Sequence, residues 1–317
     1  MDSRIHQVRR NSIKFPRSVT ICEVGPRDGL QNESITLSIE EKVHLVDRLS
    51  GAGLKVIEVG SFMNPKAVPQ MADTDEVFRR IIKKDGVEYR ALIANLKGVD
   101  RAFACGCTKV KLNVSASSAH NHANLNMSPQ ESMAGFRACA ESARGKGLDI
   151  SGSISMPFGS PWEYRIPLSD IEVIVNSYLA VGIKEISLSD AAGMAMPDQV
   201  FSICTEMRRL FPDVKWILHF HNTRGMGIAN IVAGMQAGID WFDASVGGIG
   251  GCPFVPGATG NVASEDVLHM FHEMGIETGV NLDSIIEIAK TVRTLIGHEL
   301  PSFILKAGRN SDLLPIT

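Results

Sequence analysis

The chain has 317 residues, of which 44% are hydrophobic, and its 32 basic against 35 acidic residues give a net charge of -3. This composition supports a large buried core in one big domain or two small ones, and it excludes a charge-driven partner such as nucleic acid or a membrane surface. No apolar run approaches the ~18 residues that a membrane-spanning helix needs.

The N-terminal residues 1–17 form a basic tail without the apolar core of a secretory signal. We expect the tail of a cytoplasmic protein, with a short organellar presequence as the alternative. Six cysteines in a chain of this length predict free thiols in a reducing compartment. Cys105 and Cys107 form a CxC pair that has no matching motif elsewhere, so we expect a buried structural role for both.

Short β-branched, apolar runs alternate along the chain with amphipathic helical stretches. Strands are predicted at 18–24, 56–62, 89–96, 109–116, 149–156, 184–190, 214–221 and 241–248. Helices are predicted at 38–52, 71–84, 97–105, 128–146, 168–181, 197–211, 226–238 and 263–275. Eight strands alternating with eight helices predict a (β/α)₈ TIM barrel over residues 18–279. A doubly wound open sheet is the alternative, but no glycine fingerprint follows the first strand.

Helix starts carry their own signals: Ser38 with Glu41, and Ser128 with Glu131, predict capping boxes. Residues 280–317 predict a C-terminal helical extension, packed outside the barrel or against a partner subunit. We expect a homo-oligomer, with a dimer through the C-terminal helix as one arrangement, although the sequence carries no direct sign of it.

Polar residues gather at the carboxyl ends of the predicted strands, where barrel enzymes place their sites. They are Glu23, Arg27 and Asp28 at strand 1, Glu58 and Ser61 at strand 2, Asn95 at strand 3, Asn113 and Ser115 at strand 4, Asp190 at strand 6, and His219 and His221 at strand 7. A glycine-rich loop after strand 8 holds Cys252 and reaches Asn261. This clustering predicts one functional site at that end of the barrel.

His219 and His221 lie two residues apart in a strand, so their side chains point to the same face. Strands 1 and 7 are separated only by strand 8, so Asp28 can join them, and the amide oxygen of Asn261 can be a fourth donor. This mixed set suits a divalent ion, Mg²⁺ or Mn²⁺ first, with Co²⁺ or Zn²⁺ as alternatives. The set contains no cysteine thiolates, which argues against a structural zinc site. The alternative is that both histidines are hydrogen-bonded core residues.

The segments "EVGPRDGLQNE", "VIEVGSF", "HFHNTRG" and "GGIGGCPFVPGATGNVASEDV" resemble the 3-hydroxy-3-methylglutaryl-CoA lyase family of the DRE-TIM metallolyase superfamily, over residues 18 to 280. The family cleaves a 3-hydroxyacyl-CoA to acetyl-CoA and a keto acid, so the resemblance implies an acyl-CoA substrate. It implies Asp28, His219, His221 and Asn261 as metal ligands. It also implies Arg27 as the essential arginine beside the metal, Glu58 and Asp190 as acidic groups in the pocket, and Cys252 as a mobile-loop cysteine.

This chemistry needs a base for the hydroxyl proton, for which His219 and Asp190 are candidates. Arg27 can stabilise negative charge on the thioester oxygen, and Cys252 is the candidate acid that protonates the enolate carbon. Glu58 can instead hold Arg27 or a ligand in place. Ser61 and Asn113 are candidate substrate contacts, with packing at the barrel mouth as the alternative.

The chain departs from the family pattern H-x-H-D-T-Y-G-Q at "HFHNTRGMG", where Asn222, Arg224 and Met226 replace an acid, a tyrosine and a glutamine. We expect the reaction type to be kept and the acyl group to differ, with citramalyl-CoA or a glutaryl-CoA with a longer 3-substituent as candidates. Arg224 could pair with a substrate carboxylate or replace the interaction lost at Asn222. A Claisen-condensing acyltransferase of the same superfamily and a silent ligand-binding relative are the alternative functions.

Overall fold

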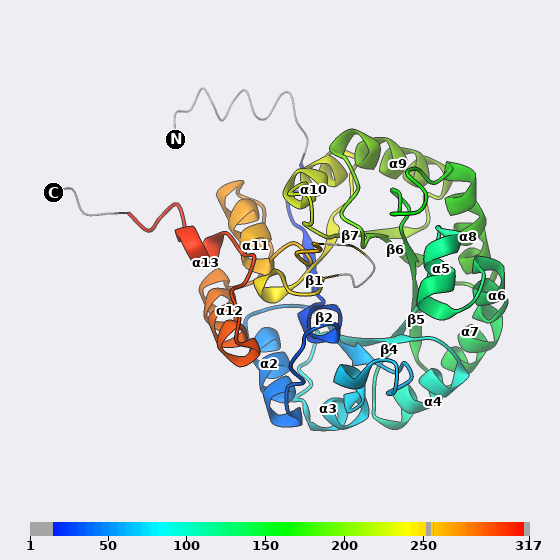
Figure 1. Cartoon of the computed structure of the whole chain (residues 1–317), viewed down its shortest axis with the longest axis horizontal. Coiled ribbons are helices and arrows are strands. Elements are labelled where there is room, and N and C mark those ends of the chain that lie inside the picture. The colour runs from blue at the N-terminus through cyan, green and yellow to red at the C-terminus, as the bar shows by residue number, and fades with distance from the viewer. Residues whose placement is uncertain (1–14, 252–254, 256, 314–317) are drawn as a thin grey trace.

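The structure, a computed structural model, describes residues 15–251, 255 and 257–313. Eight parallel strands close into a barrel in chain order, with β8 paired to β1 (Figure 1). The strands are β1 (Thr20–Glu23), β2 (Val56–Ser61), β3 (Glu88–Ile93), β4 (Lys109–Ser115), β5 (Asp149–Ser155), β6 (Glu185–Asp190), β7 (Lys215–Phe220) and β8 (Trp241–Ala244). The predicted TIM barrel and all eight strands are confirmed.

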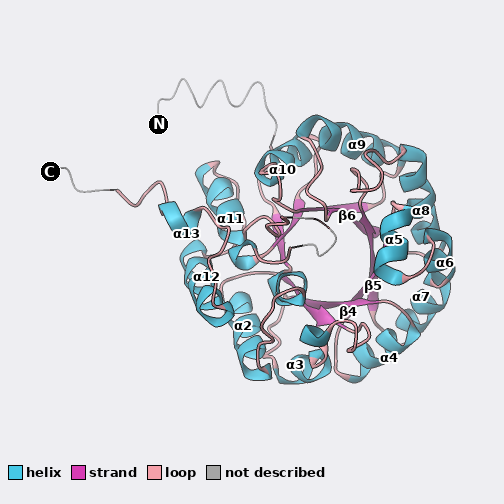
Figure 2. Cartoon of the chain, viewed as in Figure 1, coloured by secondary structure: helices cyan, strands magenta, loops and turns pink. Residues whose placement is uncertain are grey.

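Helices form a ring around the barrel (Figure 2). They are α2 (Ile39–Gly51), α3 (Thr74–Arg80), α4 (Leu96–Ala104), α5 (Ser118–Leu125), α6 (Pro129–Ala134), α7 (Phe136–Gly145), α8 (Leu168–Ala180), α9 (Pro197–Leu210), α10 (Gly227–Gln236) and α11 (Ser264–Glu273), followed by α12 (Leu282–Ile296) and α13 (Ile304–Ala307). Among these described helices, none combines the length and the apolar character that crossing a bilayer requires.

The prediction of one helix over 128–146 is wrong in detail, because this stretch divides at Gly135 into α6 and α7. The preceding α5 was not predicted at all. Its sequence, "SAHNHANL", is rich in residues of modest helix propensity, and Asn126 ends it with a left-handed φ of 53°. Local sequence therefore gives a weak signal where tertiary packing decides.

Both predicted capping boxes are present. The Ser38 hydroxyl accepts a hydrogen bond from the Glu41 amide at 3.2 Å, and the Ser38 amide donates to the Glu41 carboxylate at 2.7 Å. Ser128 and Glu131 make the same pair of contacts. These boxes fix the start of α2 and of α6.

The inner face of the barrel is unusually charged. TIM-barrel interiors are commonly filled by branched apolar residues. Here Glu185 accepts ion pairs from Arg90 at 3.0 Å, Lys109 at 2.7 Å and Lys215 at 3.0 Å. Lys109 also pairs with Glu88 at 3.2 Å. Below the mouth, the barrel interior therefore contains acidic and basic side chains that are paired with one another, which was not predicted from the sequence.

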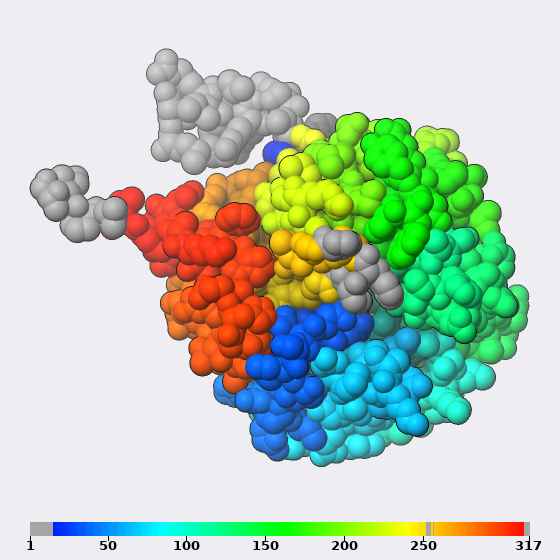
Figure 3. All heavy atoms as spheres, in the orientation of Figure 1, coloured from blue at the N-terminus to red at the C-terminus, as the bar shows by residue number. Residues whose placement is uncertain are grey.

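The C-terminal helix α12 packs outside the barrel, against α2 and α11, as predicted for residues 280–317. Figure 3 shows this red and orange segment beside the blue N-terminal helix. The boundaries 1–17, 18–279 and 280–317 stay predictions.

Cys105 and Cys107 are buried, and their thiols contact the carbonyl oxygens of Ala102 and Lys109 at 3.3 and 3.1 Å. The predicted burial of the CxC pair is confirmed. The other described cysteines, Cys22, Cys139 and Cys204, are also buried free thiols.

Candidate metal centre and active site

Arg27 and Asp28 lie on a tight π-helical turn, η1 (Gly25–Gly29), which follows β1 directly. The carbonyl of Val24 accepts hydrogen bonds from the amides of Arg27 at 3.1 Å and Asp28 at 2.7 Å. A Cβ atom at Gly29 would lie 2.6 Å from the side chain of Ile249, so only glycine lets the loop after β8 approach this turn. The turn thereby places both side chains at the barrel mouth.

Glu23 does not join the site that the sequence analysis assigned to its strand end. Its carboxylate accepts hydrogen bonds from the amides of Gly25 at 2.7 Å and Val246 at 2.9 Å, and from the Ser264 hydroxyl at 2.6 Å. Burial raises the pKa of Glu23 to about 7, although these three donors act in the opposite direction. Glu23 therefore ties the turn to the segments after β8.

Asp28, His219 and His221 bring their ligand atoms together within 4.8 Å of one another. The Asp28 Oδ2 lies 3.6 Å from His221 Nε2 and 3.9 Å from His219 Nε2. Burial alone would raise the pKa of Asp28, but Arg27 and the two histidines hold it well below its usual range. The carboxylate is therefore ionised at neutral pH, as a metal ligand must be.

Asn261 completes the donor set. Its amide nitrogen donates to Asp28 Oδ2 at 2.8 Å and to the carbonyl of Ile249 at 3.0 Å. Its Oδ1 is buried and has no hydrogen-bond partner among the residues that the structure describes. A buried acceptor of this kind needs a partner, and a divalent cation would provide one. The four residues that the sequence analysis combined are thus adjacent, and their donors fit such an ion.

His219 is oriented by Asp243, which the sequence analysis missed. The His219 Nδ1 lies 3.1 Å from Asp243 Oδ2, so Nδ1 carries the proton and Nε2 keeps its lone pair on the Asp28 side. Burial opposes ionisation of Asp243, but Lys111 and His219 lower its pKa to about 2. The available signal was one acidic residue in the otherwise apolar run "WFDA".

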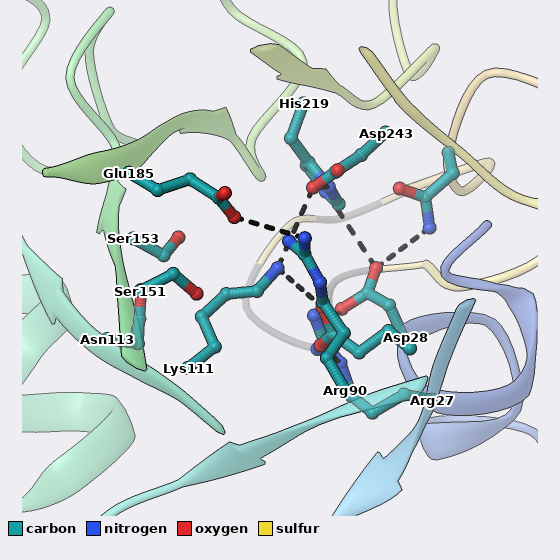
Figure 4. Close-up of polar contacts among 12 residues, drawn as sticks. Arg27, Asp28, Arg90, Lys111, Asn113, Ser151, Ser153, Glu185, His219 and Asp243 are labelled. Atoms are coloured by element: carbon teal, nitrogen blue, oxygen red, sulfur yellow. Dashed lines mark hydrogen bonds and ion pairs between the residues drawn. The ribbon is translucent and has the colours of Figure 1, made fainter. Parts of the chain in front are cut away.

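Arg27 is held by two carboxylates. Its Nη1 donates to Asp28 Oδ1 at 2.5 Å, and its Nε donates to Glu58. Lys111 contacts the second Glu58 oxygen at 2.5 Å and lies 3.8 Å from Asp243 Oδ2. Figure 4 shows that Asp28, Lys111 and Asp243 belong to one connected group of charged side chains. The structure thus places Glu58 as a support for Arg27, the second of the two roles considered for it.

Asp190 lies beside the metal ligands, and its backbone carbonyl accepts a hydrogen bond from the His221 amide at 3.2 Å. Its two carboxylate oxygens accept from the amides of Met194 and Ala195, each at 2.9 Å. Burial raises the pKa of Asp190 in spite of these donors. Asp190 is therefore a fully buried carboxyl group beside His221, and its role as a base stays a prediction.

Arg224 is exposed, and its Nη1 donates to the carbonyls of Ala192 at 2.9 Å and Gly193 at 3.2 Å, in the loop after β6. Asn222 accepts from the Gly227 amide at 3.1 Å at the start of α10. Neither side chain contacts a metal ligand among the described residues. Arg224 joins two loops at the mouth, and its predicted contact with a substrate carboxylate stays a prediction.

The weaker predicted contacts differ in their surroundings. The Ser61 hydroxyl is buried and accepts from the Met63 amide at 3.2 Å, and Asn95 caps α4 through the Gly98 amide at 3.3 Å. Asn113 is partly exposed and accepts from the Ser155 hydroxyl at 2.9 Å. Cys252 lies outside the described residues. Of these residues, Asn113 is the one placed on the inner wall with part of its surface accessible.

Replacing Asp243 with asparagine is expected to weaken Mn²⁺ binding by about 10–100-fold, because His219 loses the carboxylate that fixes its tautomer. Isothermal titration calorimetry with Mn²⁺ measures the change. Asp240→Asn, at an exposed position three residues earlier, is the control and should bind as the parent protein does. Equal affinity in D243N and the parent protein would contradict the assigned role.

Comparisons with known proteins agree on one family. The family model described as HMGL-like matches residues 18–292. The (R)-citramalyl-CoA lyase of Chloroflexus aurantiacus is 40% identical over 301 residues, which cover 92% of this chain and 95% of that protein. The 3-hydroxy-3-isohexenylglutaryl-CoA/hydroxy-methylglutaryl-CoA lyase of Pseudomonas aeruginosa is 39% identical over 295 residues, covering 93% and 98%.

Among solved structures, an HMG-CoA lyase from Acinetobacter baumannii in complex with coenzyme A and 3-methylmalate superimposes with a TM-score of 0.92. It is 42% identical in sequence, and the match covers 96% of this chain and 99% of that one. The likeness therefore extends over the barrel, the mouth loops and the C-terminal helices.

Proposed function

The chain belongs to the HMGL-like family, and from that premise we propose that it is a carbon–carbon lyase that cleaves a 3-hydroxyacyl-CoA to acetyl-CoA and a keto acid. The observation that carries this proposal is the convergence of Asp28, His219, His221 and Asn261 beside Arg27. These donors come from three separate stretches of the chain, and the barrel brings them together at its mouth.

The cation that fits these donors is Mg²⁺ or Mn²⁺, with Co²⁺ or Zn²⁺ as alternatives, because the set contains carboxylate, amide and imidazole groups and no thiolate. When bound, it would act as a Lewis acid that lowers the pKa of a substrate hydroxyl and fixes the orientation of the acyl group. Holding it would fall to Asp28, His219, His221 and Asn261.

Different residues of the chain are proposed as the base and the acid of the reaction. A base removes the proton from the hydroxyl at C3, the C2–C3 bond breaks, and its electron pair passes to the thioester as an enolate. His219 would use Nδ1 for Asp243 and Nε2 for the cation, so Asp190 is the proposed base. Cys252 is the proposed acid that delivers a proton to C2 and completes acetyl-CoA.

Arg27 is the proposed stabiliser of the enolate oxygen. Its Nε and Nη1 are bound by Glu58 and Asp28, while Nη2 donates to no side chain in the described part of the chain. A guanidinium fixed by two carboxylates is pre-oriented, so little reorganisation is needed when negative charge develops in the reaction. Glu58 and Lys111 support this arrangement from below.

The candidate substrates are 3-hydroxy-3-methylglutaryl-CoA, citramalyl-CoA and a glutaryl-CoA with a longer 3-substituent. Relatives of similar identity are named as lyases for different members of this group. We propose Arg224 as the side chain at the mouth whose contact with substrate could differ between them. A cytoplasmic location and a homo-oligomer also stay proposals.

The proposal is tested by incubating the purified protein with each thioester and Mg²⁺ or Mn²⁺, and measuring acetyl-CoA. We expect acetyl-CoA release that EDTA abolishes and excess Mg²⁺ restores. A parallel reaction with acetyl-CoA and pyruvate measures free CoA, which a condensing acyltransferase would release. No acetyl-CoA from any thioester, or release that EDTA leaves unchanged, would refute the proposed lyase.

A further inference from the structure

Three neighbouring strands carry small polar side chains on the inner wall of the barrel. The strand register pairs Asn113 with Ser153, and Ser155 with Ser189. Ser189 is in turn paired with His219 on β7. Residues paired in a parallel sheet point to the same face, and so do residues two apart in one strand, so these side chains line the inner wall in two adjacent rows: Ser155 and Ser189 lie level with His219, and Asn113 and Ser153 lie two residues earlier along β4 and β5. We call Asn113, Ser153, Ser155 and Ser189 the serine–asparagine wall.

The wall is reachable from the barrel mouth. Ser153, Ser155 and Ser189 are each 7% exposed, whereas Ser151 and Ser187 on the same strands are 1% exposed. Figure 4 shows Asn113 and Ser153 on the side of the barrel that faces Asp28 from across the interior. A molecule held at the metal ligands would therefore present its far side to this wall.

Several donors on the wall are unused. The Ser155 hydroxyl donates to Asn113 Oδ1 at 2.9 Å, which fixes the amide and leaves its Nδ2 without a partner in the described part of the chain. Among the described residues, the hydroxyls of Ser153 and Ser189 likewise form no hydrogen bond. Water can serve these donors in an open site. A bound substrate that displaces the water must offer acceptors or leave the donors unpaired, which is unfavourable.

The two basic side chains labelled with these donors on the inner wall, Lys111 and Arg90, are both paired with carboxylates. Lys111 contacts Glu58 at 2.5 Å and lies 3.8 Å from Asp243. Arg90 is likewise paired, with Glu185 and Glu88. A second carboxylate on the substrate would thus meet hydroxyl and amide dipoles with no unpaired positive charge from Lys111 or Arg90. An uncharged oxygen needs only such dipoles.

Resting on the proposed lyase function, we propose that the serine–asparagine wall is the subsite for the remaining substituent at C3 of the acyl group. The wall takes a substituent that carries an uncharged oxygen, such as a hydroxymethyl group. A methyl or longer alkyl group leaves the Ser153, Ser189 and Asn113 donors unpaired, and sites built to hydrogen-bond a substrate discriminate strongly against the analogue that lacks the group.

The test compares three thioesters that differ only at C3, carrying methyl, hydroxymethyl or carboxylate on the same 3-hydroxyglutaryl-CoA frame. The expected kcat/KM for the hydroxymethyl compound exceeds that for each of the others by at least ~10-fold. In Ser153→Ala and Asn113→Leu, this ratio should fall towards one. Ser151→Ala is the matched control, because Ser151 lies two residues earlier on β5, is sealed from the mouth and donates to the carbonyl of Val110.

The outcomes separate the two proposals. Acetyl-CoA release with no preference for hydroxymethyl, with preference for the carboxylate, or with a ratio that S153A and N113L leave unchanged overturns the assignment of the wall and leaves the lyase standing. Failure to release acetyl-CoA from any thioester overturns the lyase and the wall together. Thermal unfolding of each variant confirms that a changed ratio is measured on folded protein.

Discussion

Replacing Arg27 with methionine is expected to lower kcat by about 10²–10³-fold, the usual effect of removing one fixed donor to a developing oxyanion. Methionine keeps much of the volume and removes every N–H group. Because Arg27 donates to Asp28 and Glu58 at once, its guanidinium is fixed before substrate arrives. Steady-state kinetics with the preferred thioester, at saturating Mg²⁺, measure the change.

Two companion variants assign the loss to the guanidinium. Arg27→Lys keeps the positive charge but cannot bind two carboxylates and a third oxygen in one plane, so we expect most of the loss to persist. Glu58→Gln keeps the guanidinium and loosens its support, so its effect should be smaller than that of R27M. Mn²⁺ affinity must be measured for all three, because Arg27 also contacts the ligand Asp28. A kcat for R27M within 10-fold of the parent value would contradict the role.

The fold was predictable because the alternation of short apolar runs with amphipathic helices is a property of the whole chain. Each strand boundary could move by a few residues without changing the conclusion. What failed was local: the helix division at Gly135 and the unpredicted α5 depend on packing that no short window contains. Sequence periodicity thus gave the architecture and missed these details.

The shared direction of His219 and His221 was predictable because a strand places residues two apart on one face. The same alternation explains why the burial of Lys111 was not predicted. In "KVKLNVSA" every second residue is polar, a pattern typical of a strand with one solvated face. In a closed barrel that second face is the interior, and Lys111 is therefore buried. A charge inside a barrel is recognised only once its partners, Glu58 and Asp243, are placed beside it.

The turn that holds Arg27 and Asp28 shows a different limit. The sequence placed Glu23, Arg27 and Asp28 together at one strand end, yet Glu23 points out of the site and the other two point into it. Which of them enters depends on the phase of β1 and on the π-helical turn that follows. The residue types predict neither the phase of β1 nor the turn, apart from Gly25 and Gly29, which the turn requires.

Replacing Lys111 with methionine is expected to destabilise the folded protein by about 3–5 kcal/mol, the usual consequence of removing one partner from a buried ion pair. Lys111 is 3% exposed, and its ammonium group stands between Glu58 and Asp243. Without it, both carboxylates keep their charge in a site with little water. Urea unfolding, with midpoint and slope compared to the parent protein, measures the loss.

A double-mutant cycle separates the ion pair from the loss of packing. If the Lys111–Glu58 contact carries the effect, K111M combined with Glu58→Gln should destabilise by less than the sum of the two single changes, because the second change removes the charge that the first left unpaired. Lys290→Met, on the exposed face of α12, is the control for replacing a lysine with methionine and should leave the midpoint unchanged. Strict additivity of K111M and E58Q would show that these two charges do not stabilise each other. It would also remove the structural reason for expecting Glu58 to be held in the position from which it supports Arg27.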